Sequence, residues 1–143
     1  MYKKTITFEN LEEQEETKDF YFVLTEADLA EMEASIPGGY GAYLRKIAKE
    51  KDVNKMIEYM KFIISKSYVE KTPYGFTKLD EHGAPLFRYF AATNAYSELF
   101  MLLALNDEEA SAFCNGILPK KLRDQLDAQA IEAEKKRLLA GED

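Results

Sequence analysis

The chain has 143 residues, of which 46% are hydrophobic and 13% aromatic, and it carries a net charge of −7. This length and apolar content predict one main folded domain. The acidic balance argues against nucleic acid and anionic membranes as partners, because both bind basic surfaces. With no long apolar run and no signal peptide, the sequence predicts a protein of the cytoplasm that does not span a membrane.

Two segments near the N-terminus show the alternation of β-strands. Residues 3–8 and 19–24 flank an acidic stretch, so we expect an antiparallel hairpin with a solvated loop. An isolated hairpin is marginally stable in water, so one face must pack on helices. The side chains expected on that face are Ile6, Phe8, Phe20, Phe22 and Leu24. Tyr21 and Val23 lie on the reverse face and are candidates for contact with a partner.

Helical periodicity follows the hairpin. Thr25 is placed to cap a helix that begins at about residue 26, and Asp28 completes a capping box. Pro37 and the two glycines after it end this helix. Further helices are expected at about 41–50, 53–68 and 107–116, with Asp52 capping the second of these and Asn106 or Asp107 the third. An apolar stripe predicts that the helix at 53–68 lies in the core, and it consists of Val53, Met56, Ile57, Met60, Ile63 and Ile64.

The next two segments differ in composition, and therefore in the structure that they predict. Residues 69–85 contain two prolines and two glycines, so we expect a loop with at most a short extended piece. Residues 86–105 predict a helix that is apolar almost all round from Ala95 to Leu105, and it should therefore be buried.

The last segment, 119–143, has a looser apolar stripe among many charged residues. The stripe consists of Leu122, Leu126 and Ala130, and Ala133 and Leu138 extend it loosely. A single helix of this length is marginally stable alone, so we expect an appendage that docks on a partner or folds on binding one. The predicted fold is α+β: an antiparallel β-hairpin packed on a bundle of about five helices in a domain of residues 1–118, followed by a C-terminal amphipathic helix.

The sequence offers little support for catalysis. His82 is the only histidine and has no cysteine near it, so a solvated loop explains it better than a metal site. Cys114 is the only cysteine, which excludes an internal disulfide, and a buried small side chain is the better interpretation. We therefore expect no catalytic residue, no cofactor and no metal, and we do not expect an enzyme.

Four segments in order carry a resemblance to a known family. They are DFYFVLTEADLAEMEAS, PGGYGAYLRKI, FIISKSYVEK and NAYSELFMLLALNDEEASAFCNGILP. Over residues 2–119 this order resembles the tail assembly chaperones of long-tailed phages of Gram-positive bacteria and their prophages. The resemblance implies a non-enzymatic protein, absent from the mature virion, that keeps the tape measure protein soluble and helps to bring tail tube subunits to it.

The resemblance also implies a partner encoded by the same gene. Many such chaperones are made in two lengths, because the ribosome slips back by one nucleotide near the end of the gene. The lysine pairs Lys120-Lys121 and Lys135-Lys136 are candidate sites for slippage, and the second pair would keep the whole C-terminal helix in both products. A longer, frameshifted form of the chain is therefore an expected partner.

Two other classes of function are compatible with a small, acidic, mixed α/β chain. One is a structural component of the tail or of the head–tail connector, which would be found in purified particles. The other is a small regulatory module that binds a single protein.

Overall fold

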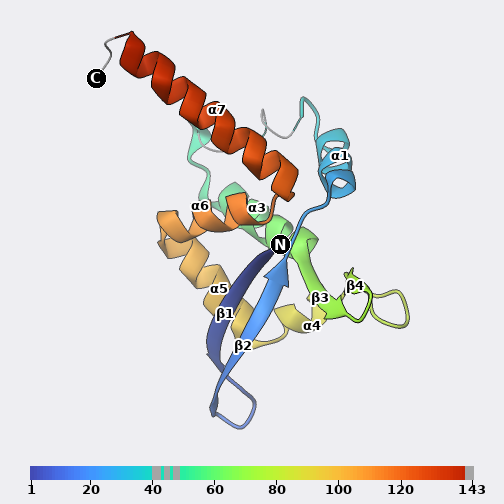
Figure 1. Ribbon diagram of the computed structural model, residues 1–143. Helices are drawn as coiled ribbons and strands as arrows, with labels where there is room; N and C mark the ends of the chain where they lie inside the picture. Colours follow the sequence, from blue (N-terminus) through green and yellow to red (C-terminus); the bar gives the residue numbers. More distant parts are fainter. Residues whose placement is uncertain (40–42, 44–45, 47–48, 141–143) are drawn as a thin grey trace.

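The computed structural model describes residues 1–39, 43, 46 and 49–140, and Figure 1 shows how their helices and strands are arranged. The fold is α+β, as predicted, with four antiparallel strands and six helices whose bounds the structure gives. In chain order they are β1 (Tyr2–Glu9), β2 (Glu15–Phe22), α1 (Glu26–Ser35), α3 (Val53–Ser67), β3 (Tyr68–Thr72), β4 (Gly75–Thr77), α4 (Phe87–Ala91), α5 (Asn94–Leu105), α6 (Asp107–Gly116) and α7 (Lys120–Leu139).

The N-terminal hairpin forms as predicted. β1 and β2 are antiparallel, and Phe8 lies opposite Glu16 at the loop end while Tyr2 lies opposite Phe22 at the other end. Alternation places Thr5 and Thr7 in solvent, and α5 packs against β1. Of the five side chains expected on the packed face, the structure buries Ile6, Phe8, Phe22 and Leu24 and leaves Phe20 half-buried against them.

The sheet is larger than the predicted hairpin. Residues 68–77, most of which were expected to form a loop, make a second hairpin that pairs with β2 in the strand order β1-β2-β3-β4. The loop prediction for residues 69–85 was therefore wrong for its first half. Pro73 and Gly75 mark the tight turn of this hairpin, and the burial of Tyr68 and Val69 beside β2 stabilises the pairing.

Aromatic contacts join this sheet to the helices behind it. The ring of Phe22 lies 5.8 Å from Tyr68, 6.0 Å from Phe90 of α4 and 5.2 Å from Phe113 of α6. Tyr68 and Phe90 are stacked with centroids 4.6 Å apart. Because these rings come from β2, β3, α4 and α6, they fix the sheet and the helices as one core.

The predicted N-terminal caps of α1, α3 and α6 are confirmed. Thr25 Oγ1 accepts a hydrogen bond from the Asp28 amide at 3.1 Å, and the Asp28 carboxylate accepts one from the Thr25 amide at 2.9 Å. The side chain of Asp52 caps α3, and that of Asn106 caps α6. Most of the helix expected at 41–50, namely residues 41–42, 44–45 and 47–48, lies outside the described residues.

The segment 86–105 departs from its prediction in two ways. It divides into α4 and α5, because Thr93 is extended (φ −105°, ψ 159°) and its hydroxyl donates to the Phe90 carbonyl at 2.7 Å. The expected burial all round α5 is also wrong, since Leu99 and Leu103 are buried but Met101 is 48% and Leu105 79% exposed. The sheet and neighbouring helices cover only one side of α5.

Candidate partner-binding surfaces

The outer face of the sheet carries a small aromatic patch. Paired residues of antiparallel strands share a face, so the register puts Tyr21, Val69, Lys71 and Phe76 on the face opposite Phe22. The Lys71 ammonium lies 4.5 Å from the ring centroid of Tyr21, and Phe76 is 40% exposed. Tyr21 is half-buried. The patch is therefore amphipathic.

Val23, the other residue expected on this face, is placed differently. Its side chain is buried, and its amide donates to the carbonyl of Ser67 at 2.8 Å, just beyond the end of β2. The folded chain therefore presents little of Val23 to a partner, because the last residues of α3 lie alongside it.

The first half of α3 presents apolar side chains to solvent. The stripe that predicted a core helix is buried only at its C-terminal end, where Ile63 and Ile64 join the core. At its N-terminal end Val53 is 66%, Met56 49% and Ile57 41% exposed. These three residues, which we call the α3 stripe, lie on one face of the helix because their spacing is i, i+3 and i+4. The core prediction for Val53, Met56 and Ile57 was therefore wrong, since no described neighbour covers this end of the helix.

An apolar groove lies between the C-terminal end of α1 and α3. Its volume is about 640 Å³, and the described residues that line it are Ser35, Ile36, Pro37, Tyr43, Lys46, Glu58, Tyr59 and Phe62. The chain leaves α1 at Ile36, whose backbone is extended (φ −110°, ψ 118°), and turns at Gly38 and Gly39, both with positive φ. Ile36 and Pro37 line the groove together with Tyr59 and Phe62 of α3. Aromatic and aliphatic side chains with one cation and one anion at the rim suit an amphipathic ligand.

The C-terminal helix projects from the body of the molecule. Figure 1 shows α7 running from the end of α6 towards the C-terminus, away from the sheet. Near its start Leu122 is half-buried, and Arg123 Nε donates to the Leu118 carbonyl at 3.1 Å. Towards its end Leu138 is 64% exposed, whereas the side chains of Leu126 and Ala130 lie outside the description. Among the described side chains, packing on the body is confined to the first turn.

Comparison with known proteins identifies the family. The family model for phage tail assembly chaperones matches residues 1–142, which is almost the whole chain and includes α7. The chain belongs to this family. No curated protein and no solved structure matches it.

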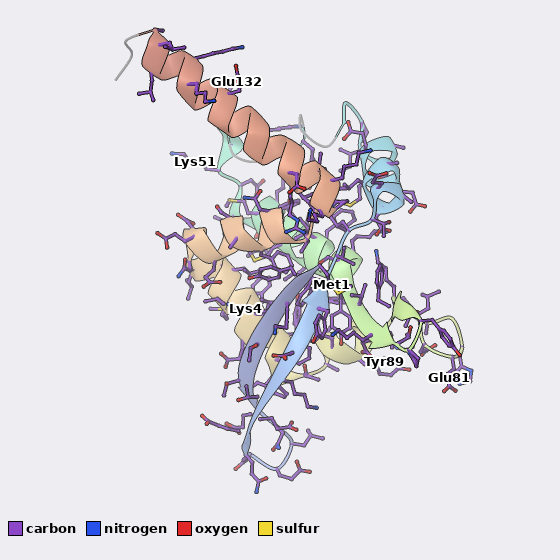
Figure 2. The ribbon with its side chains drawn as sticks, in the orientation of Figure 1. Met1, Lys4, Lys51, Glu81, Tyr89 and Glu132 are labelled. Atoms are coloured by element: carbon purple, nitrogen blue, oxygen red, sulfur yellow. The ribbon has the colours of Figure 1, made fainter. Side chains whose placement is uncertain are left out.

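The polar loop after β4 has a structural explanation in this chaperone. Asp80 accepts hydrogen bonds from the amides of His82 and Ala84, each at 2.9 Å, and from the Tyr89 hydroxyl. The Ala84 amide and the Tyr89 hydroxyl lower the pKa of Asp80. Glu81 and Tyr89 lie on the side of the molecule away from Lys51 (Figure 2). These interactions order the loop, and His82 itself is exposed.

Cys114 is also accounted for by the packing of the chaperone. It is half-buried on α6, and burial raises the pKa of its thiol, which disfavours the nucleophilic thiolate. Within the described residues no group of three or more His, Cys, Asp and Glu side chains is arranged to hold a metal ion. In the same part of the chain, no helix is both long and apolar enough to cross a membrane.

Sequence reasoning missed the α3 stripe and the groove for different reasons. The stripe was detected but assigned to the core, because periodicity shows which residues share a face and not whether that face is covered. A usable signal was present: lysines occur at positions 49, 51, 55 and 61 around it. The groove depends on the path of the chain after Pro37 and has no local sequence signature.

Proposed function

We propose that this tail assembly chaperone binds the tape measure protein of a long-tailed phage or prophage of Gram-positive bacteria and keeps it soluble while the tail is assembled. The observation that carries the proposal is the apolar groove between α1 and α3. A long chain of amphipathic helices exposes apolar stripes before it is enclosed in the tail tube. A groove lined by Ile36, Pro37, Tyr59 and Phe62 can cover such a stripe in the helix-in-groove mode.

The charge of the chaperone supports the same role. Ten acidic residues and three lysines precede residue 37, and the loop between β1 and β2 is exposed. A net negative charge helps to keep a complex with a hydrophobic client in solution, because like charges oppose association between complexes. Tyr21 on the sheet and the α7 residues Leu122, Leu126, Ala130 and Leu138 are proposed as further contacts.

The test is co-expression of the chaperone with the tape measure protein of the same phage or prophage. We expect the tape measure protein to move from the insoluble to the soluble fraction and to be recovered with the tagged chaperone. Ser35→Trp and Glu58→Trp place an indole at the rim of the groove, on exposed positions, and should reduce this recovery. Ala27→Trp, on an exposed position of α1 outside the groove, is the matched control. A tape measure protein that is equally insoluble with and without the chaperone contradicts the proposal.

The remaining parts of the proposal concern where the chaperone acts during tail assembly and which other proteins it brings together. The chaperone acts in the host cytoplasm, is absent from the mature virion and helps to bring tail tube subunits to the tape measure protein. A longer form of the chain, made by slippage at Lys135-Lys136 or Lys120-Lys121, adds the segment that recruits these subunits. The gene sequence decides whether either lysine pair lies in a slippery heptamer. Mass spectrometry of purified particles separates this role from that of a structural tail or connector component, which would be present there.

A further inference from the structure

The α3 stripe lies within the basic part of an acidic protein. Residues 45–66 hold seven basic and three acidic residues, a net charge of +4 in a chain whose total is −7. The stripe, consisting of Val53, Met56 and Ile57, falls in the middle of this segment and is exposed. An apolar surface and a positive potential therefore coincide on the first half of α3.

Two of the three acidic residues of this segment are engaged within it, and the third, Glu58, lines the groove between α1 and α3. Glu50 pairs with Lys55 at 3.3 Å, and the carboxylate of Asp52 caps α3 by accepting the Lys55 amide. By contrast, three exposed lysines that flank the stripe in the sequence, Lys49, Lys51 and Lys61, make no ion pair with a described residue. Figure 2 shows Lys51 on the side of the molecule opposite Glu81, away from the polar loop.

We propose that the α3 stripe binds an amphipathic helix whose apolar face is bordered by carboxylates. Val53, Met56 and Ile57 cover the apolar face, and methionine adapts its shape to different side chains, which suits a client that presents many similar helices in turn. The bordering lysines attract carboxylates and exclude helices with basic borders, since like charges across an interface are unfavourable. This inference rests on the proposed function and specifies the chemistry of the client segments.

The experiment uses two synthetic peptides of about 18 residues with identical leucine faces, long enough to form a helix on binding. One peptide has glutamates beside the leucines, and the other has lysines. Fluorescence anisotropy with the full-length chaperone should show the glutamate peptide binding about tenfold more tightly, with the difference reduced at high salt. Val53→Gln, Met56→Gln and Ile57→Gln together should weaken the binding of both peptides, leaving only what the groove between α1 and α3 contributes.

Matched variants distinguish binding at the α3 stripe from a general effect of removing exposed apolar side chains. Leu11→Gln removes an apolar side chain that is 99% exposed in the hairpin loop, and it should leave binding unchanged. Lys49→Glu, Lys51→Glu and Lys61→Glu together should reverse the preference between the two peptides. Equal binding of the two peptides by the parent chain overturns the proposal, as does unchanged binding by the glutamine variant. A dimer that the glutamine variant abolishes overturns it too, because the occupant of the stripe is then a second copy of the chain.

Failure of this inference can be distinguished from failure of the proposed function. If the glutamine variant keeps the tape measure protein soluble as well as the parent does, the chaperone role stands and the α3 stripe is not its binding surface. If the parent fails to keep the tape measure protein soluble, the proposed function fails whatever the peptides show.

Discussion

The ammonium group of Lys78 donates to the carboxylate of Asp28, so the loop after β4 is tied to the N-terminal cap of α1. The same oxygen of Asp28 accepts the amide of Thr25 at 2.9 Å, which closes the capping box. One side chain thus completes a local helix cap and a contact between segments far apart in the sequence. Both side chains are largely shielded from solvent, since that of Lys78 is 29% exposed and that of Asp28 is 21% exposed.

Replacing Asp28 should test this double role. Asp28→Ala removes the half of the capping box that the Asp28 carboxylate makes, and it leaves the Lys78 charge unpaired, so we expect a loss of about 1–2 kcal/mol in the free energy of unfolding at pH 7. Burial alone would raise the pKa of Asp28, but the hydrogen bonds from Lys78 and Thr25 outweigh it and lower the pKa. Urea denaturation gives the comparison, with Glu26→Gln in the same turn as the control. Equal stability of Asp28→Ala and the parent would show that the pair contributes nothing.

The pH dependence follows from the lowered pKa of Asp28. A carboxyl group whose pKa is lower in the folded state stabilises the fold above its unfolded pKa of about 4, and this contribution is lost as the pH falls through the folded pKa. The difference between the parent and Asp28→Ala should therefore be full at pH 7 and shrink below about pH 4. A difference that stays constant down to pH 2 would mean that the charge on Asp28 is not involved.

Phe22 should be among the most sensitive positions of the core. Its side chain is fully buried and its ring contacts Tyr68, Phe90 and Phe113. Phe22→Ala should lower the free energy of unfolding by about 3–5 kcal/mol, through lost transfer energy and the cavity left among these rings. Phe76→Ala, at a 40% exposed position of β4, is the control and should cost far less. A melting temperature close to that of the parent would remove Phe22 from the core.

Local sequence patterns predicted the structural features that depend only on residues close together in the sequence. The alternation at Ile6 and Phe8 and the capping box of Thr25 and Asp28 each involve residues within one strand or one helical turn, and the structure contains them as expected. The pairing of β3 with β2 is different, because Pro73 and Gly75 are equally compatible with an open loop and with a hairpin turn. The burial of Tyr68 and Val69 beside a distant strand decides between them, and no local pattern reports it.

The candidate surfaces were less predictable than the fold. Tyr21 was selected from alternation along one strand, but its neighbours Lys71 and Phe76 come from strands that were not predicted. Exposure of Val53 and Met56 depends on how far other elements reach along α3, which is a property of the assembled fold. Sequence alone therefore gives the apolar faces, whereas the structure decides which of them remain uncovered.

Gly116 has a role that its position at the end of α6 does not reveal. A Cβ atom at this position would lie 2.3 Å from Cδ2 of the Tyr2 ring, which itself packs edge-on against Phe113 with centroids 5.4 Å apart. Gly116→Ala gains up to about 1 kcal/mol in helix propensity but should lose about 1–3 kcal/mol to crowding, so we expect net destabilisation in thermal melts.

A second substitution isolates the crowding at Gly116. In Tyr2→Leu the ring is absent, so adding Gly116→Ala to this variant should cost less than it does in the parent. Ser111→Ala, on an exposed position of the same helix, should have little effect. Strict additivity of the Tyr2 and Gly116 substitutions would show that the two residues do not interact.

The last prediction concerns α7. Its described contacts with the body are limited to its first turn, where Leu122 is half-buried and Arg123 Nε donates to the Leu118 carbonyl, so little of the core depends on it. Removing residues 120–143 should leave a folded chain whose melting temperature falls by no more than about 5 °C. Truncation before Asn106 is the contrasting case, because it removes Phe113 and Ile117, both fully buried, and should abolish folding. The chain without residues 120–143 should also recover less tape measure protein in the pull-down, since α7 is proposed as a contact. If it precipitates or melts far below the parent, α7 belongs to the core and the boundary between residues 118 and 119 is wrong; if it is stable and recovers the client fully, α7 is not a contact surface.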